Sequence, residues 1–208
     1  QGTAFSGVFD GNGHTISHLT IIGGSYLGLF GQLEQPGEVK DLGVVDVRIT
    51  GSGASVGGLV GTHWGTLTHC YSDGSVTGNH YVGGLAGNNG GNMDDCYSTG
   101  TVSGNGWSVG GLVGDNYVGY VTQCYSTGAV SGGGHVGGLV GGNYGGVIQS
   151  CSTGTVSGTW YVGGLVGTNY GPGIMQFSHD ATNGISVDWG VEDNYGAGME
   201  GGGGFVTC

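Results

Sequence analysis

The sequence has almost no basic side chains. Lys40 and Arg48 are its only lysine and arginine in 208 residues, against 14 acidic residues, so the formal net charge is −12. A surface of this sign repels phosphate groups, which argues against nucleic acid and anionic membranes as partners. No apolar run approaches the roughly 20 residues that a membrane helix needs, so we expect no membrane insertion.

Catalytic and metal-binding patterns are also missing. The chain has no His-Glu-x-x-His motif and no Cys-x-x-Cys pair. Asp94 and Asp95 are adjacent, so on a strand they would point to opposite sides and could not act as a carboxylate pair. The seven histidines follow no metal-ligand spacing and are interpreted as turn and surface residues. We therefore predict no enzyme activity, no cofactor and no metal site.

Glycine is abundant, and it recurs in a repeat. The chain has 55 glycines, and the hexapeptide VGGLVG begins at Val56, Val109, Val136 and Val162, with VGGLAG at Val82. Successive copies start 26, 27, 27 and 26 residues apart. Each copy continues through a polar turn, a short stretch that ends in Cys-Tyr-Ser, and a Thr-Gly-x-Val-Ser-Gly segment, with small departures. Such regularity predicts an array of identical structural units.

The repeat favours an all-β parallel β-solenoid. Each unit contains about three short apolar stretches bounded by Gly, Asn or Ser, which is typical of strands, and no helical periodicity. Stacked coils place equivalent residues about 4.8 Å apart in columns. We expect glycine at the corners to permit positive φ and close approach, and right-handed coiling. An interior leucine column is predicted at Leu59, Leu85, Leu112, Leu139 and Leu165.

The chain divides into two predicted parts. Residues 1–173 form the solenoid, with divergent coils over 1–55 and regular coils over 56–173. Residues 174–208 lose the repeat and are predicted to form a C-terminal cap or docking segment, because an open solenoid end needs a cover.

The repeated VGGLVG, Asn-x-Gly and Cys-Tyr-Ser-x-Gly-x-Val-x-Gly pattern resembles the GLUG-repeat family, as does the FDGNGHTI…LGLFG segment before it. The resemblance covers roughly Phe5 to Gly171. Members of this family are modules of large bacterial surface proteins, including filamentous-haemagglutinin-like adhesins, and of some immunoglobulin-A peptidases. The resemblance implies a secreted, cell-surface location, and it transfers no catalytic residues.

Aromatic residues recur at two matched corners of the unit. Stacked aromatics stiffen a sheet surface, whereas exposed aromatic patches bind partners; the first interpretation is favoured, and the second stays open. One set follows the hexapeptide, at Trp64, Tyr117, Tyr144 and Tyr170, and a second set precedes it, at Tyr81, Trp107, Trp160 and Tyr161.

Five cysteines also follow the repeat. Cys70, Cys96 and Cys124 share the Cys-Tyr-Ser context and are predicted to form a ladder of small buried thiols. Cys151 aligns with either the cysteine or the tyrosine column. An odd count in a secreted protein leaves one thiol over, so Cys208 is a candidate for a disulfide with Cys151 or with a second molecule.

Two functions fit these observations. The first is a non-catalytic extracellular structural protein that associates with itself end to end as a filament or stalk. The second is an adhesin or carbohydrate-binding module that contacts polysaccharide or host-surface glycans through the aromatic columns.

Overall fold

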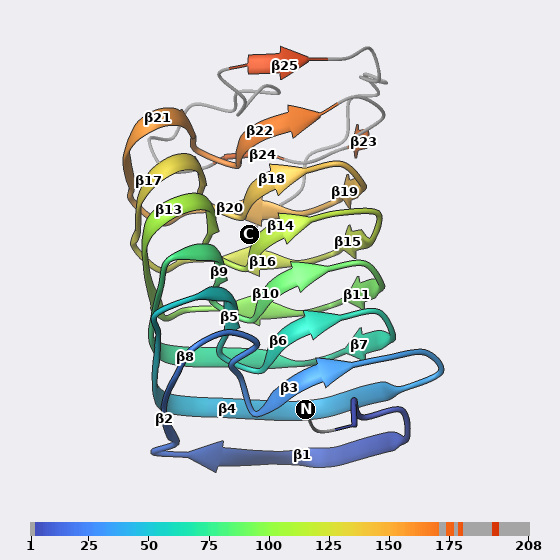
Figure 1. Cartoon of the computed structure of the whole chain (residues 1–208). Helices are drawn as coiled ribbons and strands as arrows, with labels where there is room; N and C mark the ends of the chain where they lie inside the picture. Colours follow the sequence, from blue (N-terminus) through green and yellow to red (C-terminus); the bar gives the residue numbers. More distant parts are fainter. Residues whose placement is uncertain (1–2, 171–173, 177–178, 181–192, 196–208) are drawn as a thin grey trace.

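The chain is wound into a parallel β-solenoid, which Figure 1 shows as a stack of coils rising from the N-terminal end. The computed structural model describes residues 3–170, 174–176, 179–180 and 193–195. These residues contain no helix, and thus none long and apolar enough to cross a membrane. The predicted all-β solenoid with a repeat of about 27 residues is confirmed.

Two sheets form the walls of the solenoid. One sheet has seven strands, contributed one each by successive coils: β3 (Phe30–Leu33), β6 (Val60–His63), β10 (Ala86–Asn89), β14 (Val113–Asn116), β18 (Val140–Asn143), β22 (Val166–Tyr170) and β25 (Asp193–Tyr195).

The second sheet has 18 strands and makes up the rest of each coil. Its N-terminal strands are β1 (Val8–Ser17), β2 (Thr20–Gly23), β4 (Glu38–Gly51), β5 (Ala54–Gly57), β7 (Thr66–Thr68), β8 (Tyr71–Gly78) and β9 (His80–Gly83). Its middle strands are β11 (Asn92–Asp94), β12 (Tyr97–Ser98), β13 (Thr101–Gly110), β15 (Tyr120–Thr122), β16 (Tyr125–Ser126) and β17 (Val130–Gly137). Its last strands are β19 (Gly146–Ile148), β20 (Cys151–Ser152), β21 (Val156–Gly163), β23 (Ile174–Gln176) and β24 (His179–Asp180).

Equivalent residues of successive repeats are paired across the coils. Val113 of β14 pairs with Val140 of β18, which pairs with Val166 of β22. The short strands β23 and β24 pair with β19 and β20, so the ladder continues past residue 173. Most of the predicted cap or docking segment, 174–208, lies outside the described residues, so that assignment stays a prediction.

Among the regular coils, length changes at two corners, while the strands between them keep their register. Three residues separate Asn116 from Tyr120, against two at the same corner of the preceding coil. Two residues separate Gly104 from Trp107, against one at the same corner of the following coil. Differences in length are therefore absorbed outside the core.

Columns of apolar side chains fill the interior, as predicted. The five hexapeptide leucines are all at most 2% exposed, and the valines beside them are fully buried. Glycine is required next to this column because a Cβ on Gly137 would overlap the carbonyl oxygen of Val140, and one on Gly138 would overlap that of Gly164. The VGGLVG pattern is therefore a packing requirement.

The expectation that glycine supplies positive φ at the corners is wrong for most of them. Among the described glycines only Gly13 and Gly74 have positive φ, whereas Ser108 (61°), His135 (49°) and Tyr161 (52°) occupy one corner column in that conformation. Their backbone lies against a glycine of the next coil: a Cβ on Gly167 would overlap the backbone of His135, and one on Gly141 would overlap that of Ser108. Glycine is thus needed beneath the corner residue, and the corner itself accepts polar and aromatic residues at a modest conformational cost.

A ladder of asparagines replaces apolar residues in one interior column. Asn89, Asn116, Asn143 and Asn169 are fully buried. The amide nitrogen of each of the first three donates to the amide oxygen of the next, at 2.9, 2.7 and 2.6 Å. These bonds satisfy polar groups that would otherwise be costly to bury.

Candidate binding surfaces

The first predicted aromatic set forms a continuous column on one corner. Trp64 meets Tyr117 edge to face, with ring centroids 6.2 Å apart, because its ring reaches across Gly90 of the intervening coil. Tyr117 lies 6.2 Å from Tyr144, and Tyr144 stacks on Tyr170 at 4.2 Å with ring planes 10° apart. These contacts are of the kind that stabilise a sheet surface.

The second predicted set does not form one cluster. Tyr81 and Tyr161 occupy the positive-φ corner column, three coils apart. Trp107 and Trp160 occupy a neighbouring column, in which both pair with Gly134 of the coil between them. Their exposed fractions, 50% and 65%, are among the largest of any apolar side chain in the described residues.

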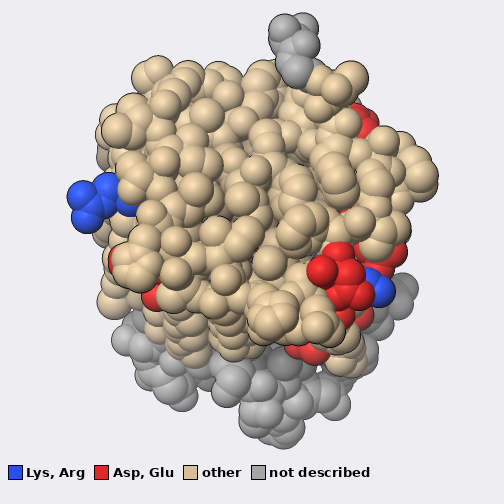
Figure 2. All heavy atoms as spheres, turned by 90° about the horizontal axis from the view of Figure 1, so that it is seen from below, with Lys and Arg blue, Asp and Glu red and all other residues tan. Residues whose placement is uncertain are grey.

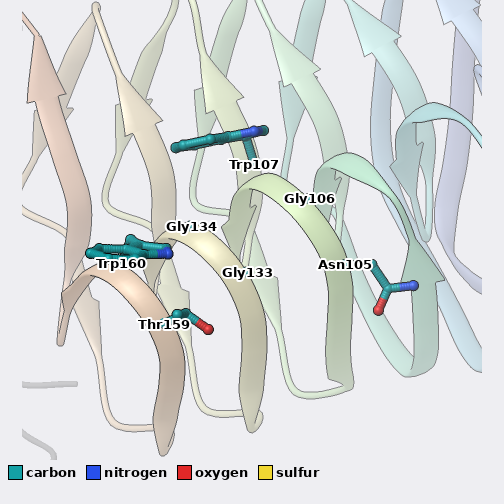
Figure 3. Close-up of a pocket in the computed structure, with 7 residues that line it drawn as sticks. All are labelled: Asn105, Gly106, Trp107, Gly133, Gly134, Thr159 and Trp160. Carbon is teal, nitrogen blue, oxygen red and sulfur yellow. The ribbon is translucent and has the colours of Figure 1, made fainter.

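A pocket lies between these two tryptophans (Figure 3). The flat sides of both indole rings border a coil that carries only glycines at this point. The pocket has a volume of about 230 Å³, and we call it the Trp pocket; it is lined by Asn105, Gly106, Trp107, Gly133, Gly134, Thr159 and Trp160. No charged side chain is among these lining residues.

His135 holds one wall of the Trp pocket in place, a role that the sequence did not indicate. Its ring stacks on Tyr161 at 4.8 Å, lies 4.9 Å from Trp107, and is hydrogen-bonded to the Tyr170 hydroxyl at 2.9 Å. Burial lowers the pKa of His135. His135 lies one residue before the hexapeptide, as Tyr81 and Tyr161 do, and this shared position could have predicted that the three share a column.

Two of the seven histidines depart from the expected turn and surface role. His63 is fully buried and His135 is 9% exposed, whereas the described others are intermediate or exposed: His14, His18, His69 and His80. His63 occupies the asparagine column beside Asn89. His179 has no described side chain.

Sequence reasoning missed a third aromatic column. Tyr71, Tyr97 and Tyr125 stack face to face, with both centroid distances 4.7 Å and ring planes 1° and 4° apart. Each is the central residue of a Cys-Tyr-Ser triplet, so its recurrence at the repeat spacing was the signal. Because these rings cover one another, they present edges to solvent and have less free surface than the two tryptophans.

The cysteines occupy two columns. Cys70, Cys96 and Cys124 are buried free thiols in one column, which Ser150 continues by accepting the Cys124 N–H bond at 3.0 Å. Burial raises the pKa of the Cys96 thiol, so it is a poor nucleophile at neutral pH. Cys151 is paired with Tyr125 and therefore belongs to the tyrosine column. Cys208 lies outside the described residues, and its disulfide stays a prediction.

The N-terminal end of the solenoid forms a second candidate surface. Strands β1 and β2 pair with β4 and, within the described residues, with no other strand. Side chains in interior columns are incompletely covered there: Phe9 and Ile21 are half-buried, although their pairing partners in β4 are fully buried. Seen from this end in Figure 2, charged side chains lie at the rim and the middle of the face carries none.

Comparison with known proteins agrees with the repeat pattern. The model of the GLUG motif matches residues 52–77 and 78–103, so the chain carries GLUG repeats. Halomucin from Haloquadratum walsbyi is 43% identical over 81 residues, which are 38% of this chain and 1% of halomucin. The chain thus spans a very small part of that relative.

A solved structure shares the fold. The crystal structure of a candidate immunoglobulin A1 protease from Bacteroides ovatus superposes with a TM-score of 0.75 at 24% identity, covering 92% of this chain and 68% of that one. At this identity the likeness establishes a common solenoid and nothing about activity.

Proposed function

We propose that this chain is a non-catalytic structural segment of an extracellular surface protein, which extends a stalk or filament by end-to-end stacking of solenoids. The observation that carries the proposal is the coil-to-coil pairing itself: equivalent residues of successive coils pair in register, as Val113, Val140 and Val166 do. Strands β1 and β2 are the last described strands at one end of this ladder. Unpaired parallel edges are templates for further strands. A second copy of the chain is the occupant proposed for this end.

The side chains at this end support stacking. Phe9, Ile21 and Phe30 pack against the core but remain half-buried, because no coil lies beneath them in the described residues. Covering each would bury apolar area worth roughly 25 cal/mol per Å². The net charge of −12 opposes side-by-side association, because like charges on parallel rods repel one another. Growth along the axis is thus favoured over lateral clumping.

The extracellular location is part of the same proposal. The GLUG repeats and the similarity to halomucin, a protein whose name denotes a mucin, support it. The absence of enzyme activity is proposed because the contacts of His69 with Asp41 and Asp95 are exposed ion pairs, and the described residues hold no group of three or more side chains that could bind a metal ion.

Sedimentation velocity and negative-stain electron microscopy over a range of concentrations test the proposal. We expect thin rods that lengthen with concentration. Ile21→Lys should abolish lengthening because it places an ammonium group in the end face, and Phe9→Lys should act in the same way. Ile22→Lys is the matched control, since Ile22 is 79% exposed and alternates to the outer side of the same strand.

Folding of each variant is checked by circular dichroism. Monomers of wild-type protein at every concentration would overturn the proposal. Equal lengthening of folded Ile21→Lys and wild type would overturn the assignment to this end.

A further inference from the structure

The Trp pocket has the chemistry of a ligand site rather than of a structural contact. The backbones of its two tryptophans are about two coil spacings apart, roughly 10 Å, and the residue between them in the column is Gly134. The Trp107 ring rests on Gly134 of the next coil, and Trp160 stays 65% exposed. Exposed paired aromatics beside a hollow mark contact surfaces.

We propose that the Trp pocket binds one neutral pyranose ring of a polysaccharide chain. A pyranose has an apolar C–H face, which fits the electron-rich face of an indole, and a rim of hydroxyls, which fits amide and hydroxyl side chains. The Trp pocket has both among its lining residues: the two indoles, and the polar side chains of Asn105 and Thr159. Its lining carries no charge to neutralise a uronate or to pair with a cation.

The size of the Trp pocket limits the ligand to a single ring. Its volume of about 230 Å³ is below the roughly 300–1,000 Å³ of pockets that enclose drug-sized molecules. The remaining sugars of a polysaccharide would extend over the neighbouring coils, in solvent. Affinity per site is then modest, and repeated contacts along a polymer would raise it.

One wall of the Trp pocket is fixed before any ligand arrives. The Trp107 backbone N–H donates to His80 Nδ1 at 3.0 Å, and its ring rests on Gly134, where a Cβ would lie 3.0 Å from Cε3. The His135 ring supports it from the side. A rigid aromatic loses little conformational entropy on binding, so Trp107 is the primary stacking surface and Trp160 the outer one.

Binding at this pocket does not rest on end-to-end stacking, because the pocket lies on the side of the solenoid and not on its end. The two proposals therefore fail or succeed separately.

The test is titration of the full chain with neutral oligosaccharides, maltoheptaose, cellohexaose and mannohexaose, followed by tryptophan fluorescence and calorimetry. A polyuronate and choline serve as charged probes. We expect at least one neutral probe to bind. Trp107→Ala and Trp160→Ala should each lower the affinity for that probe at least tenfold. Gly134→Gln, which fills the pocket and displaces the Trp107 ring that rests on Gly134, should weaken binding as well.

Trp64→Ala is the matched control, since it removes an indole from the other corner, and its affinity should stay within twofold of wild type. All variants are checked for a native circular dichroism spectrum at the titration temperature and for unchanged sedimentation, which separates loss of binding from loss of fold or of assembly. The proposal would be overturned if no neutral probe binds or if choline alone binds. Equal affinity of folded Trp107→Ala, folded Trp160→Ala and wild type would overturn it as well.

Discussion

At the scale of single residues, two of the buried ionisable side chains, His63 and Asp115, lie in columns whose neighbouring positions are uncharged. His63 lies beside Asn89, and Asp115 lies between Asn88 and Gly142. Burial lowers the pKa of His63 to about 4 and raises that of Asp115 to about 6. Both groups resist their charged forms, so they change stability with pH in opposite directions.

His63→Asn is expected to remove an acid sensitivity. The unfolded imidazole takes up a proton near pH 6.5 and the folded one only near pH 4, so its contribution to stability is complete above pH 6.5 and is lost as pH falls toward 4. A pKa shift of this size corresponds to about 3 kcal/mol in the free energy of unfolding. Urea unfolding at pH 7.5 and 4.5 should show that the variant loses less stability than wild type. The exposed His14→Asn is the control, and equal losses in all three proteins would contradict the prediction.

Asp115→Asn is expected to stabilise the protein at neutral pH. Because burial raises the folded pKa above the usual 3.8, the contribution of this carboxyl is fully present below pH 3.8 and is lost as pH rises through about 6. An amide fits at this column position, as Asn88 shows, and it carries no charge. Unfolding free energy at pH 7.5 should rise by about 1–3 kcal/mol and at pH 3.5 should hardly change. No gain at pH 7.5 would refute this, with exposed Glu34→Gln as the reference.

At the scale of elements, ladders of identical side chains join one coil to the next. The asparagine ladder does so through hydrogen bonds in the interior, and the tyrosine ladder through stacked rings on the surface. Each ladder gives a coil a contact with both neighbours, which is the nearest-neighbour coupling that stabilises repeat proteins.

Asn89→Ala should be far more damaging than Asn88→Ala in the same strand. Asn89 is fully buried, donates to Asn116, and accepts the Gly91 N–H bond at 3.2 Å. Its removal leaves two buried groups without partners, at a cost of about 1–3 kcal/mol each. Asn88 is only partly buried, so its truncation should cost a small fraction of that. Comparable denaturation midpoints for the two variants would count against the ladder as a source of stability.

The tyrosine ladder depends on rings rather than on hydroxyls. Tyr97→Ala removes two stacked pairs, which are worth about 0.5–1.5 kcal/mol each beyond the buried area, whereas Tyr97→Phe keeps both. Thermal unfolding should therefore place Tyr97→Phe close to wild type and Tyr97→Ala well below it. If the two variants unfold at the same temperature, stacking contributes nothing measurable.

The repeat spacing determines how much of the fold and of the candidate site could be predicted from the sequence. Recurrence at a fixed spacing predicts which residues share a column, so the leucine column was predictable residue by residue. It does not indicate which way a column faces, and the tyrosines of Cys-Tyr-Ser were overlooked for that reason. The spacing also fails where a residue is inserted or lost. Only the strand register in the structure places Trp107 and Trp160 in one column across Gly134, and Cys151 in the tyrosine column.

At the scale of the whole molecule, each coil contacts chiefly its neighbours, so the solenoid should tolerate shortening. Deletion of residues 1–24 removes β1 and β2 and leaves β4 as the end strand. We expect the shortened chain to keep its β-sheet circular dichroism and to unfold at a lower urea concentration, since one interface between coils is lost. Complete unfolding of the shortened chain would mean that the first coils nucleate the rest.

The two corners where coil length varies, after Asn116 and before Trp107, have a use in protein engineering. Because one extra residue there leaves the paired strands in register, these corners are the natural places to graft longer peptides. Epitopes or metal-binding loops inserted at successive coils would be displayed in a row, at intervals of about 4.8 Å, on a scaffold whose interior they never enter.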